Sequence, residues 1–176
     1  MDASEVDVAI IRPARGDDAP LLSRLAAQTF SETFAHLYPP ADLAAFIAET
    51  YRPDAFARDL ADREQAIWLM EARGAAIGYA QVGPCGLPHP EVTAQCGELK
   101  RIYLQRRWQG GGRGSRLLAT ALDWLEQSGR RRIWLGVWSG NAGAQRLYAA
   151  RGFVKVGDYE FAVGAVRDHE FIFRRG

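Results

Sequence analysis

The sequence predicts a single α/β domain built on a mixed sheet that carries helices on both faces. The chain has 176 residues, the size of one ordinary domain. Hydrophobic residues make up 48% of it and charged residues 24%, a composition typical of a folded globular chain. The order of elements decides the class, because one β-α-β crossover lies among strands that otherwise follow one another directly. We therefore expect residues 1–176 to form one domain.

The first part of the chain predicts a strand followed by helices. Residues 6–13 are rich in Val and Ile and end at a proline, which indicates a short strand. Asp17 and Asp18 then precede leucines at helical spacing, and acids complement the dipole at a helix start. Within the aromatic-rich residues 29–51, two adjacent prolines predict two short helices. A further helix is expected after Pro53.

The middle of the chain predicts a hairpin and a third strand. Residues 66–71 and 75–82 are predicted strands, and Arg73-Gly74 between them is a two-residue turn typical of an antiparallel hairpin. Residues 83–95 hold three prolines and two glycines, which predicts a loop. Residues 96–104 are expected to form the next strand.

The second half is more regular. Residues 114–127 place leucines and alanines along one helical face, and residues 133–138 form the nearly continuous apolar run of a buried parallel strand. A helix is predicted from Asn141, a plausible N-cap, to Arg151-Gly152. Two final antiparallel strands are expected over residues 153–161 and 169–173.

Charge and cysteine usage narrow the class of protein. The net charge is +1, which is too balanced for a general nucleic-acid binder. The first ten residues lack the basic start and the apolar run of a signal peptide, and no stretch has the apolar length of a membrane span. A cytoplasmic protein without membrane contact is therefore expected. Cys85 and Cys96 predict neither a disulfide framework nor a metal site. The scattered His36, His89 and His169 lack ligand spacing, so no metal is predicted.

A glycine-rich turn follows the strand over residues 96–104. Glycine lets a ligand approach the backbone, and the N–H groups at a helix start suit phosphate oxygens. No lysine follows these glycines as a P-loop requires, and neither glycine register fits the dinucleotide pattern G-x-G-x-x-G. The pattern Q/R-x-x-G-x-G/A is matched by Gln109, Gly112 and Gly114. Arg113 and Arg116 add positive charge for a pyrophosphate.

A second motif begins at residue 141. The pattern N-x-x-A-x-x-x-Y-x-x-x-G-F is complete from Asn141 to Phe153, and Asn141 and Tyr148 project within roughly 20° of each other on one helix at 3.6 residues per turn. The two motifs together resemble the GNAT superfamily of N-acetyltransferases. The resemblance implies a mostly antiparallel sheet of about seven strands in which strands 96–104 and 133–138 are parallel and splay apart. It also implies direct acetyl transfer from acetyl-coenzyme A to an amine, without a metal.

The resemblance also implies which residues form the site. Tyr148 matches the general acid that protonates the leaving sulfur, and Asn141 matches a contact to the pantetheine arm. The implied coenzyme-binding residues are Ile102, Tyr103, Leu104, Gln109, Gly110, Gly111, Gly112, Arg113, Gly114, Ser115, Asn141 and Tyr148.

Glu98 is the second catalytic candidate. It lies six residues before Leu104, so strand alternation would place both on one face, and it matches the base carboxylate of histone-acetylating family members. We expect it to deprotonate the amine through a water molecule. The alternative is a surface charge at the strand end or an ion pair with Arg101 or Arg132.

The acceptor amine is less well defined. Segments around Phe30, Tyr103 and Trp138 resemble the PaiA-type branch, which acetylates spermidine and spermine. The candidate acceptor residues are Phe30, Glu32, Phe34 and Tyr159, with further carboxylates at Asp42, Glu49, Asp158, Glu160, Asp168 and Glu170. A polyamine, an amino-acid-like small amine and a peptide amine all stay open, as does a non-catalytic acyl-CoA-binding module. A homodimer is also compatible with the aromatic first helices.

Overall fold

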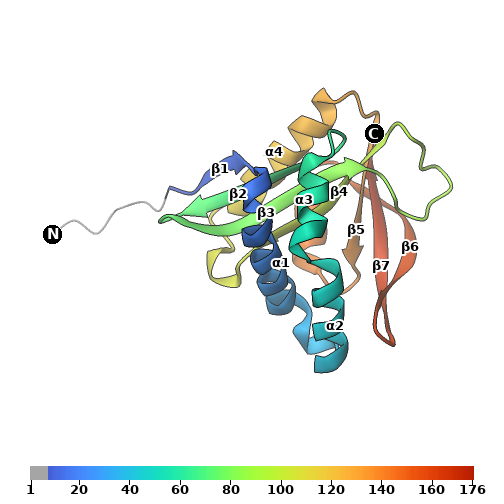
Figure 1. The fold of residues 1–176 in the computed structure, drawn as a ribbon. Coiled ribbons are helices and arrows are strands. Elements are labelled where there is room, and N and C mark those ends of the chain that lie inside the picture. Colours follow the sequence, from blue (N-terminus) through green and yellow to red (C-terminus); the bar gives the residue numbers. More distant parts are fainter. Residues whose placement is uncertain (1–7) are drawn as a thin grey trace.

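The computed structural model describes residues 8–176, which form a seven-stranded sheet with helices around it (Figure 1). The strands are β1 (Ile10–Pro13), β2 (Ala66–Ala72), β3 (Ala75–Pro84), β4 (Cys96–Leu104), β5 (Arg132–Trp138), β6 (Val154–Val163) and β7 (Val166–Arg175). The α-helices are α1 (Ala19–Phe34), α2 (Pro40–Thr50), α3 (Pro53–Ala61), α4 (Arg113–Gln127) and α5 (Ala142–Ala149). The strand order is β1-β2-β3-β4-β5-β7-β6. Only β4 and β5 are parallel, so the predicted mixed sheet is confirmed.

The hairpin of β2 and β3 forms as its turn predicts. Arg73 and Gly74 both have positive φ angles, 52° and 73°, as a tight two-residue hairpin turn requires. Side chains of β2 alternate between the two faces of the sheet. Leu69 packs with α1 and α3 on one face, whereas Met70 packs with α4 on the other.

Helices therefore cover both faces of the sheet, as predicted. The leucines of α4 are buried against one face together with Tyr148 of α5, and Leu22 and Phe30 of α1 are buried against the other. Burial of each large apolar side chain stabilises the fold by about 1.5–3 kcal/mol. Within residues 8–176, no helix has the length and apolar character needed to cross a membrane.

Most predicted boundaries lie within a few residues of the observed ones, and differences are clear at the first strand, the end of α1 and the last strand. The first strand begins at Ile10; residues 8 and 9 are not strand, and residues 6 and 7 lie outside the described part. Residues 29–34 continue α1 and do not form a separate helix, because no proline or glycine interrupts the chain before Pro39. The last strand, Val166–Arg175, is longer than the predicted residues 169–173. The prediction was too short because it relied on apolar residues, and the ends of this strand carry polar side chains.

The predicted splay between β4 and β5 is present. Their pairing covers only Cys96–Glu98 against Arg132–Trp134, after which the two strands diverge. The edge of β4 that faces β5 therefore has no strand partner from Leu99 to Leu104 among the described residues, and Gln109 Nε2 donates to the carbonyl of Leu104 at 3.3 Å. This opening in the middle of the sheet positions the candidate site.

Candidate functional site

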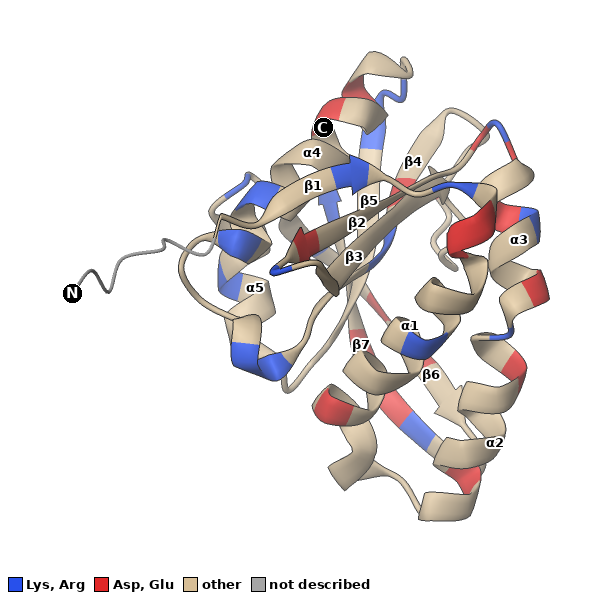
Figure 2. Ribbon diagram, turned by 60° about the vertical axis from the view of Figure 1, so that its left-hand side comes forward, with Lys and Arg blue, Asp and Glu red and all other residues tan. Residues whose placement is uncertain are grey.

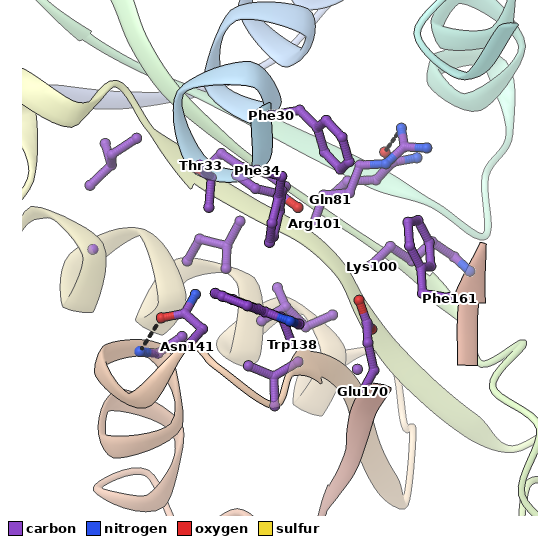
Figure 3. A pocket seen from close by; sticks show the side chains of 18 of the residues that line it. Phe30, Thr33, Phe34, Gln81, Lys100, Arg101, Trp138, Asn141, Phe161 and Glu170 are labelled. Carbon is purple, nitrogen blue, oxygen red and sulfur yellow. Dashed lines mark hydrogen bonds between the residues drawn. The ribbon is translucent and has the colours of Figure 1, made fainter. Parts of the chain in front are cut away.

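A cavity of about 980 Å³ occupies the opening between β4 and β5. Figure 3 shows side chains that line it, with Phe34 of α1 opposite Trp138 and with Asn141 and Glu170 on two sides. Its wall is formed by α1, β4, the loop after β4, the end of β5, α5 and the β6–β7 hairpin. The volume is at the upper end of the roughly 300–1,000 Å³ common for small-molecule sites.

The glycine turn forms one end of this cavity. Gly110, Gly111 and Gly112 all have positive φ angles, 86°, 60° and 75°, and Gly112 is the N-cap of α4. A Cβ atom added at Gly110 or Gly112 would meet nothing within 4 Å, so the space over the turn is open. The first N–H groups of a helix have no partner within it, and its N-terminus favours anions. The turn therefore has the donors and the open surface that a pyrophosphate needs.

The predicted coenzyme residues divide into two groups. Those that line the cavity are Ile102, Tyr103, Leu104, Gln109, Gly110, Gly114, Asn141 and Tyr148. The others, Gly111, Gly112, Arg113 and Ser115, belong to the same turn but lie outside the cavity wall. The structure thus brings the backbone edge of β4, the glycine turn and the start of α5 together around one space.

Basic side chains lie beside the glycine turn. Figure 2 colours lysine and arginine positions blue along the ribbon, and several blue segments lie near the label α5. The guanidinium of Arg113 lies 5.3 Å from the ring centroid of Trp108, a cation–π contact that holds it near the start of α4. Arg116 instead donates from Nη2 to the carbonyl of Ala9 at 2.9 Å, so this charge is tied to the segment before β1.

Asn141 caps α5, as its sequence position predicts. Its Oδ1 accepts a hydrogen bond from the backbone N–H of Ala144 at 3.1 Å, which fixes the side chain at the cavity wall (Figure 3). The amide nitrogen Nδ2 makes no hydrogen bond to any residue from 8 to 176, so it is free to donate to a ligand.

Replacing Asn141 separates these two roles. We expect Asn141→Ala to lower the free energy of unfolding by about 0.5–2 kcal/mol, because the cap is lost. Asn141→Asp keeps an oxygen acceptor and should retain that stability, yet it loses the Nδ2 donor. Urea denaturation measures the first effect, and the Km for acetyl-coenzyme A measures the second. Equal Km values for Asn141→Asp and the native chain would contradict a ligand contact through Nδ2.

Tyr148 lies on α5 with its ring buried and its hydroxyl at the cavity. The side chain is 6% exposed, and its ring packs against Phe153 at a centroid distance of 6.1 Å. The hydroxyl makes no hydrogen bond to any described residue and is not among the enclosed unpaired atoms, so it faces open space. Burial and the nearby Glu170 carboxylate raise the pKa of Tyr148 well above the usual 10.0. The phenol thus keeps its proton at neutral pH.

Glu98 lies at the cavity, but not on the face that alternation predicted. Arg101 pairs with Gln81 and Leu99 pairs with Val82, so Lys100 is an extra residue that forms a β-bulge. The bulge reverses the alternation, and Leu99 packs in the same core as Leu104 although they are five positions apart, an odd spacing that regular alternation would place on opposite faces. The expectation that Glu98 and Leu104 share a face is therefore wrong.

The partners of Glu98 also differ from the expected ones. Its Oε2 accepts hydrogen bonds from the backbone N–H of Gly86 at 2.9 Å and from Lys100 Nζ at 3.3 Å. Arg101 is not an ion-pair partner, and Arg132 binds Glu91 at 2.7 Å. One oxygen of Glu98 is thus occupied by the loop after β3 and by the bulge lysine.

All four predicted acceptor residues line the cavity. Phe30 and Phe34 are buried with a centroid distance of 4.8 Å, and they form an aromatic wall. One carboxylate oxygen of Glu32 is already occupied, because its Oε2 accepts a hydrogen bond from the backbone N–H of Arg106 at 2.6 Å. It therefore joins α1 to the turn that follows β4. Tyr159 lies on the hairpin and donates its hydroxyl proton to Glu170.

Strand β7 carries two acids beside the site, of which Glu170 lines the cavity and Asp168 lies outside its wall. Asp168 and Glu170 lie two residues apart on β7, and each accepts a hydrogen bond from a tyrosine, Tyr38 and Tyr159 respectively. Burial is the main reason that the pKa of Glu170 is raised above 4.5, and the charge of Asp168 raises it further. The hydrogen bond from Tyr159 acts in the opposite direction.

The opposite wall carries a cation without a carboxylate partner. Arg101 lies over the rings of Tyr51 and Phe56, at 5.0 and 5.6 Å, and donates from Nη1 to Gln81 Oε1 at 3.1 Å. Gln81 in turn donates to Asp59 at 2.8 Å. Among the described residues Arg101 forms no ion pair, so its charge is balanced only through Gln81.

Trp138, Gly136 and Gln81 are among the site residues to which the sequence assigned no role. The ring of Trp138 makes an edge-to-face contact with Phe34 at a centroid distance of 6.1 Å. Gly136 lies two residues before Trp138 on β5, and Gln81 accepts a hydrogen bond from Arg101. The tryptophan had a signal in the sequence, since it ends the buried strand next to the Asn141 motif. Gly136 and Gln81 had none, because their roles depend on partners from distant strands.

The sequence also matches known N-acetyltransferases. Residues 27–153 match the acetyltransferase (GNAT) family. The chain is 32% identical over 162 residues to an uncharacterized N-acetyltransferase of Mycobacterium bovis, which covers 90% of this chain and 97% of the relative. It is 27% identical over 158 residues to an uncharacterized N-acetyltransferase in the pepI 3′ region of Lactobacillus delbrueckii subsp. lactis, with 90% and 91% covered.

A solved structure shares the fold. The PaiA N-acetyltransferase of Thermoplasma acidophilum, crystallised in complex with coenzyme A, superposes with a TM-score of 0.77. The two chains are 20% identical, and the match covers 96% of this chain and 98% of the other. The order of strands and the opening in the sheet described above are therefore those of a known acetyltransferase fold.

Proposed function

The chain belongs to the acetyltransferase (GNAT) family and is an acetyl-coenzyme A-dependent N-acetyltransferase, and we propose that its acceptor is the amine of a small molecule. One observation carries the proposal. The cavity in the β4–β5 opening joins a phosphate-suited helix start at one end to a chamber of aromatic and charged side chains at the other.

The residues present fit the coenzyme. Open space over Gly110 and Gly112 leaves room for a pyrophosphate, and Arg113 supplies charge beside it. The edge of β4 that lacks a strand partner from Leu99 to Leu104 offers N–H and C=O groups to the amide groups of a pantetheine arm, in the manner of an added strand. When bound, the coenzyme supplies the acetyl group as a thioester.

Tyr148 is the proposed general acid. Its hydroxyl faces the cavity, and burial holds the proton on the phenol at neutral pH. Departure of a thiolate is easier when a proton is delivered to sulfur, and a positioned acid contributes about 10²–10⁴-fold to a rate. Glu98 stays a candidate for the base, with one oxygen held by Gly86 and Lys100.

The charges of the chamber favour an amino-acid-like acceptor. Glu170 on β7 suits an ammonium group, whereas Arg101 on β4 suits an anion. An acceptor that carries both an amine and a carboxylate would satisfy both walls. A polyamine, the second candidate, is favoured by the acids and by the PaiA-type resemblance, but it would place cations near Arg101.

Substitution of Arg101 distinguishes these two acceptors. For an acceptor with a carboxylate, we expect Arg101→Gln to raise Km by about 10–100-fold, because a hydrogen-bonded charge pair contributes about 1.5–3 kcal/mol. The matching amine without the carboxylate should be unaffected, and Arg101→Lys should recover part of the loss. Arg58→Gln, on exposed α3, is the matched control. Preference of the native chain for spermidine over every amino acid would favour the polyamine.

Thiol release tests the function itself. Acetyl-coenzyme A is incubated with spermidine, spermine, single amino acids, small amino-acid conjugates and a lysine peptide, each compared with a blank lacking acceptor. Release with a small amine but not with the peptide is the expected result. Release with the peptide alone would favour a protein amine. Coenzyme binding without release for any acceptor would favour a regulatory acyl-CoA-binding module.

A further inference from the structure

The position of Glu170 at the cavity wall is fixed by its two neighbouring strands, by a hydrogen bond and by the space over a glycine. Glu170 lies on β7 directly between Trp138 of β5 and Tyr159 of β6 in the strand register. Side chains paired in this way project from the same face of a sheet. Figure 3 shows that Glu170 extends from β7 into the cavity beside Trp138.

The absence of a side chain at Gly136 makes this arrangement possible. A Cβ atom there would lie 3.2 Å from Glu170 Oε2 and even closer to the hydroxyl of Tyr159. The hydrogen-bonded pair therefore occupies the space over Gly136. Because Tyr159 donates to Oε2, it fixes the orientation of the carboxyl group.

The other carboxylate oxygen is available to a ligand. Oε1 makes no hydrogen bond to any residue of the described chain, and it is not among the enclosed unpaired atoms. It therefore reaches the open cavity that Tyr148 also lines. The negative charge of Glu170 helps to raise the pKa of Tyr148, as expected for two groups that line the same cavity.

We propose that Glu170 is the general base, and that its Oε1 receives the acceptor ammonium and removes one proton from it. The proposal rests on the proposed function, since it concerns the amine of the same reaction. Tyr159 is a positioning residue that holds Glu170 through Oε2. Glu98 differs, because its bound oxygen is paired with the cation of Lys100 at 3.3 Å, whereas the partner of Glu170 is the neutral phenol of Tyr159.

The proton balance of the step is complete. One N–H bond of the ammonium breaks and an O–H bond forms at Glu170 Oε1, which leaves a lone pair on nitrogen. That pair forms the C–N bond, and the C–S bond breaks with its electrons on sulfur. Tyr148 gives its proton to sulfur, and the second nitrogen proton, lost as the amide forms, restores Tyr148. The proton on Glu170 passes to solvent.

Glu170→Gln tests the base directly. At pH 7, with an acceptor amine of pKa near 10, we expect kcat/Km to fall by about 10²–10⁴-fold, the usual contribution of a positioned base. The deficit should shrink as the pH approaches the pKa of the amine, because a neutral amine no longer needs a base. Thermal stability and coenzyme binding should change little, since glutamine keeps an oxygen for Tyr159.

Tyr159→Phe gives a second test, which is the pH dependence of the rate. If Tyr159 had only a structural role, its loss would not shift this pH dependence. In the native chain, activity falls as the pH drops through the pKa of Glu170, which lies above 4.5. Loss of the Tyr159 donor should raise this pKa further and shift the acid limb to higher pH, whereas Glu170→Gln should abolish the limb. The other titratable groups facing Glu170 are Asp168, Tyr38, Tyr103 and Tyr148, and Glu98 acts on Tyr159.

Two comparisons make the outcome decisive. Glu160, a candidate carboxylate from the sequence, is exposed on the same hairpin and does not line the cavity, so Glu160→Gln is the matched control and should keep native kinetics. If the native chain acetylates an amine and Glu170→Gln retains its rate and acid limb, Glu170 is not the base. Loss of the limb in Glu98→Gln alone would assign the base to Glu98. If the native chain acetylates no amine, the proposed function fails first.

Discussion

Replacement of Tyr148 by phenylalanine is expected to lower kcat by about 10²–10⁴-fold, the contribution usual for a positioned general acid. The substitution removes only the hydroxyl. The ring remains to pack against Phe153, so the fold and the coenzyme site should be preserved. Because the hydroxyl makes no hydrogen bond to any described residue, its loss leaves no protein donor or acceptor unpaired. Single-turnover thiol release at saturating acetyl-coenzyme A measures the effect.

The pH profile gives this prediction a second test. The pKa of Tyr148 is raised above 10.0, so the native chain should retain its acid, and with it the rate, up to at least pH 10. Tyr79→Phe is the matched control, because Tyr79 is fully buried, its hydroxyl is unpaired and it lies outside the cavity wall. Native turnover by Tyr148→Phe, or an alkaline limb well below pH 10, would exclude Tyr148 as the acid.

Most helices and strands could be predicted from the sequence, because their turns, limits and caps depend on residues that are close in the chain. The turn at Arg73-Gly74, the exact limits of β4 and the cap at Asn141 are all set within a few positions of the chain. The splay of β4 from β5 followed from the family resemblance, and the pairing of only three residues on each strand confirms it.

The orientation of the charged residues could not be predicted in the same way. The bulge at Lys100 reverses the face of Glu98, and no turn residue or proline marks it in the sequence. A second irregularity between Lys155 and Gly157 shifts the register of β6 against β7. Which acid of the hairpin meets Tyr159 depends on that shift, so Glu170 appeared in the sequence only as one of several carboxylates.

The glycine turn should produce the largest change in coenzyme binding. Gly110, Gly111 and Gly112 adopt positive φ angles, which cost other residues about 1–2 kcal/mol each. In a triple substitution of these glycines by alanine, the turn can relax to another conformation in the free protein. It must then regain the strained one to present its N–H groups to a pyrophosphate. We expect the Kd for coenzyme A to rise by about 10²–10⁴-fold, since 1.4 kcal/mol is tenfold.

Gly129→Ala separates this effect from general destabilisation. Gly129 follows the other end of α4, has a φ of 80° and also has nothing within 4 Å of an added Cβ. Its substitution should cost the fold about 1–2 kcal/mol yet leave the Kd for coenzyme A unchanged. Calorimetric titration of both variants decides the matter. If the triple variant binds coenzyme A as tightly as the native chain, the pyrophosphate does not rest on this turn, and the open edge of β4 would have to provide the affinity.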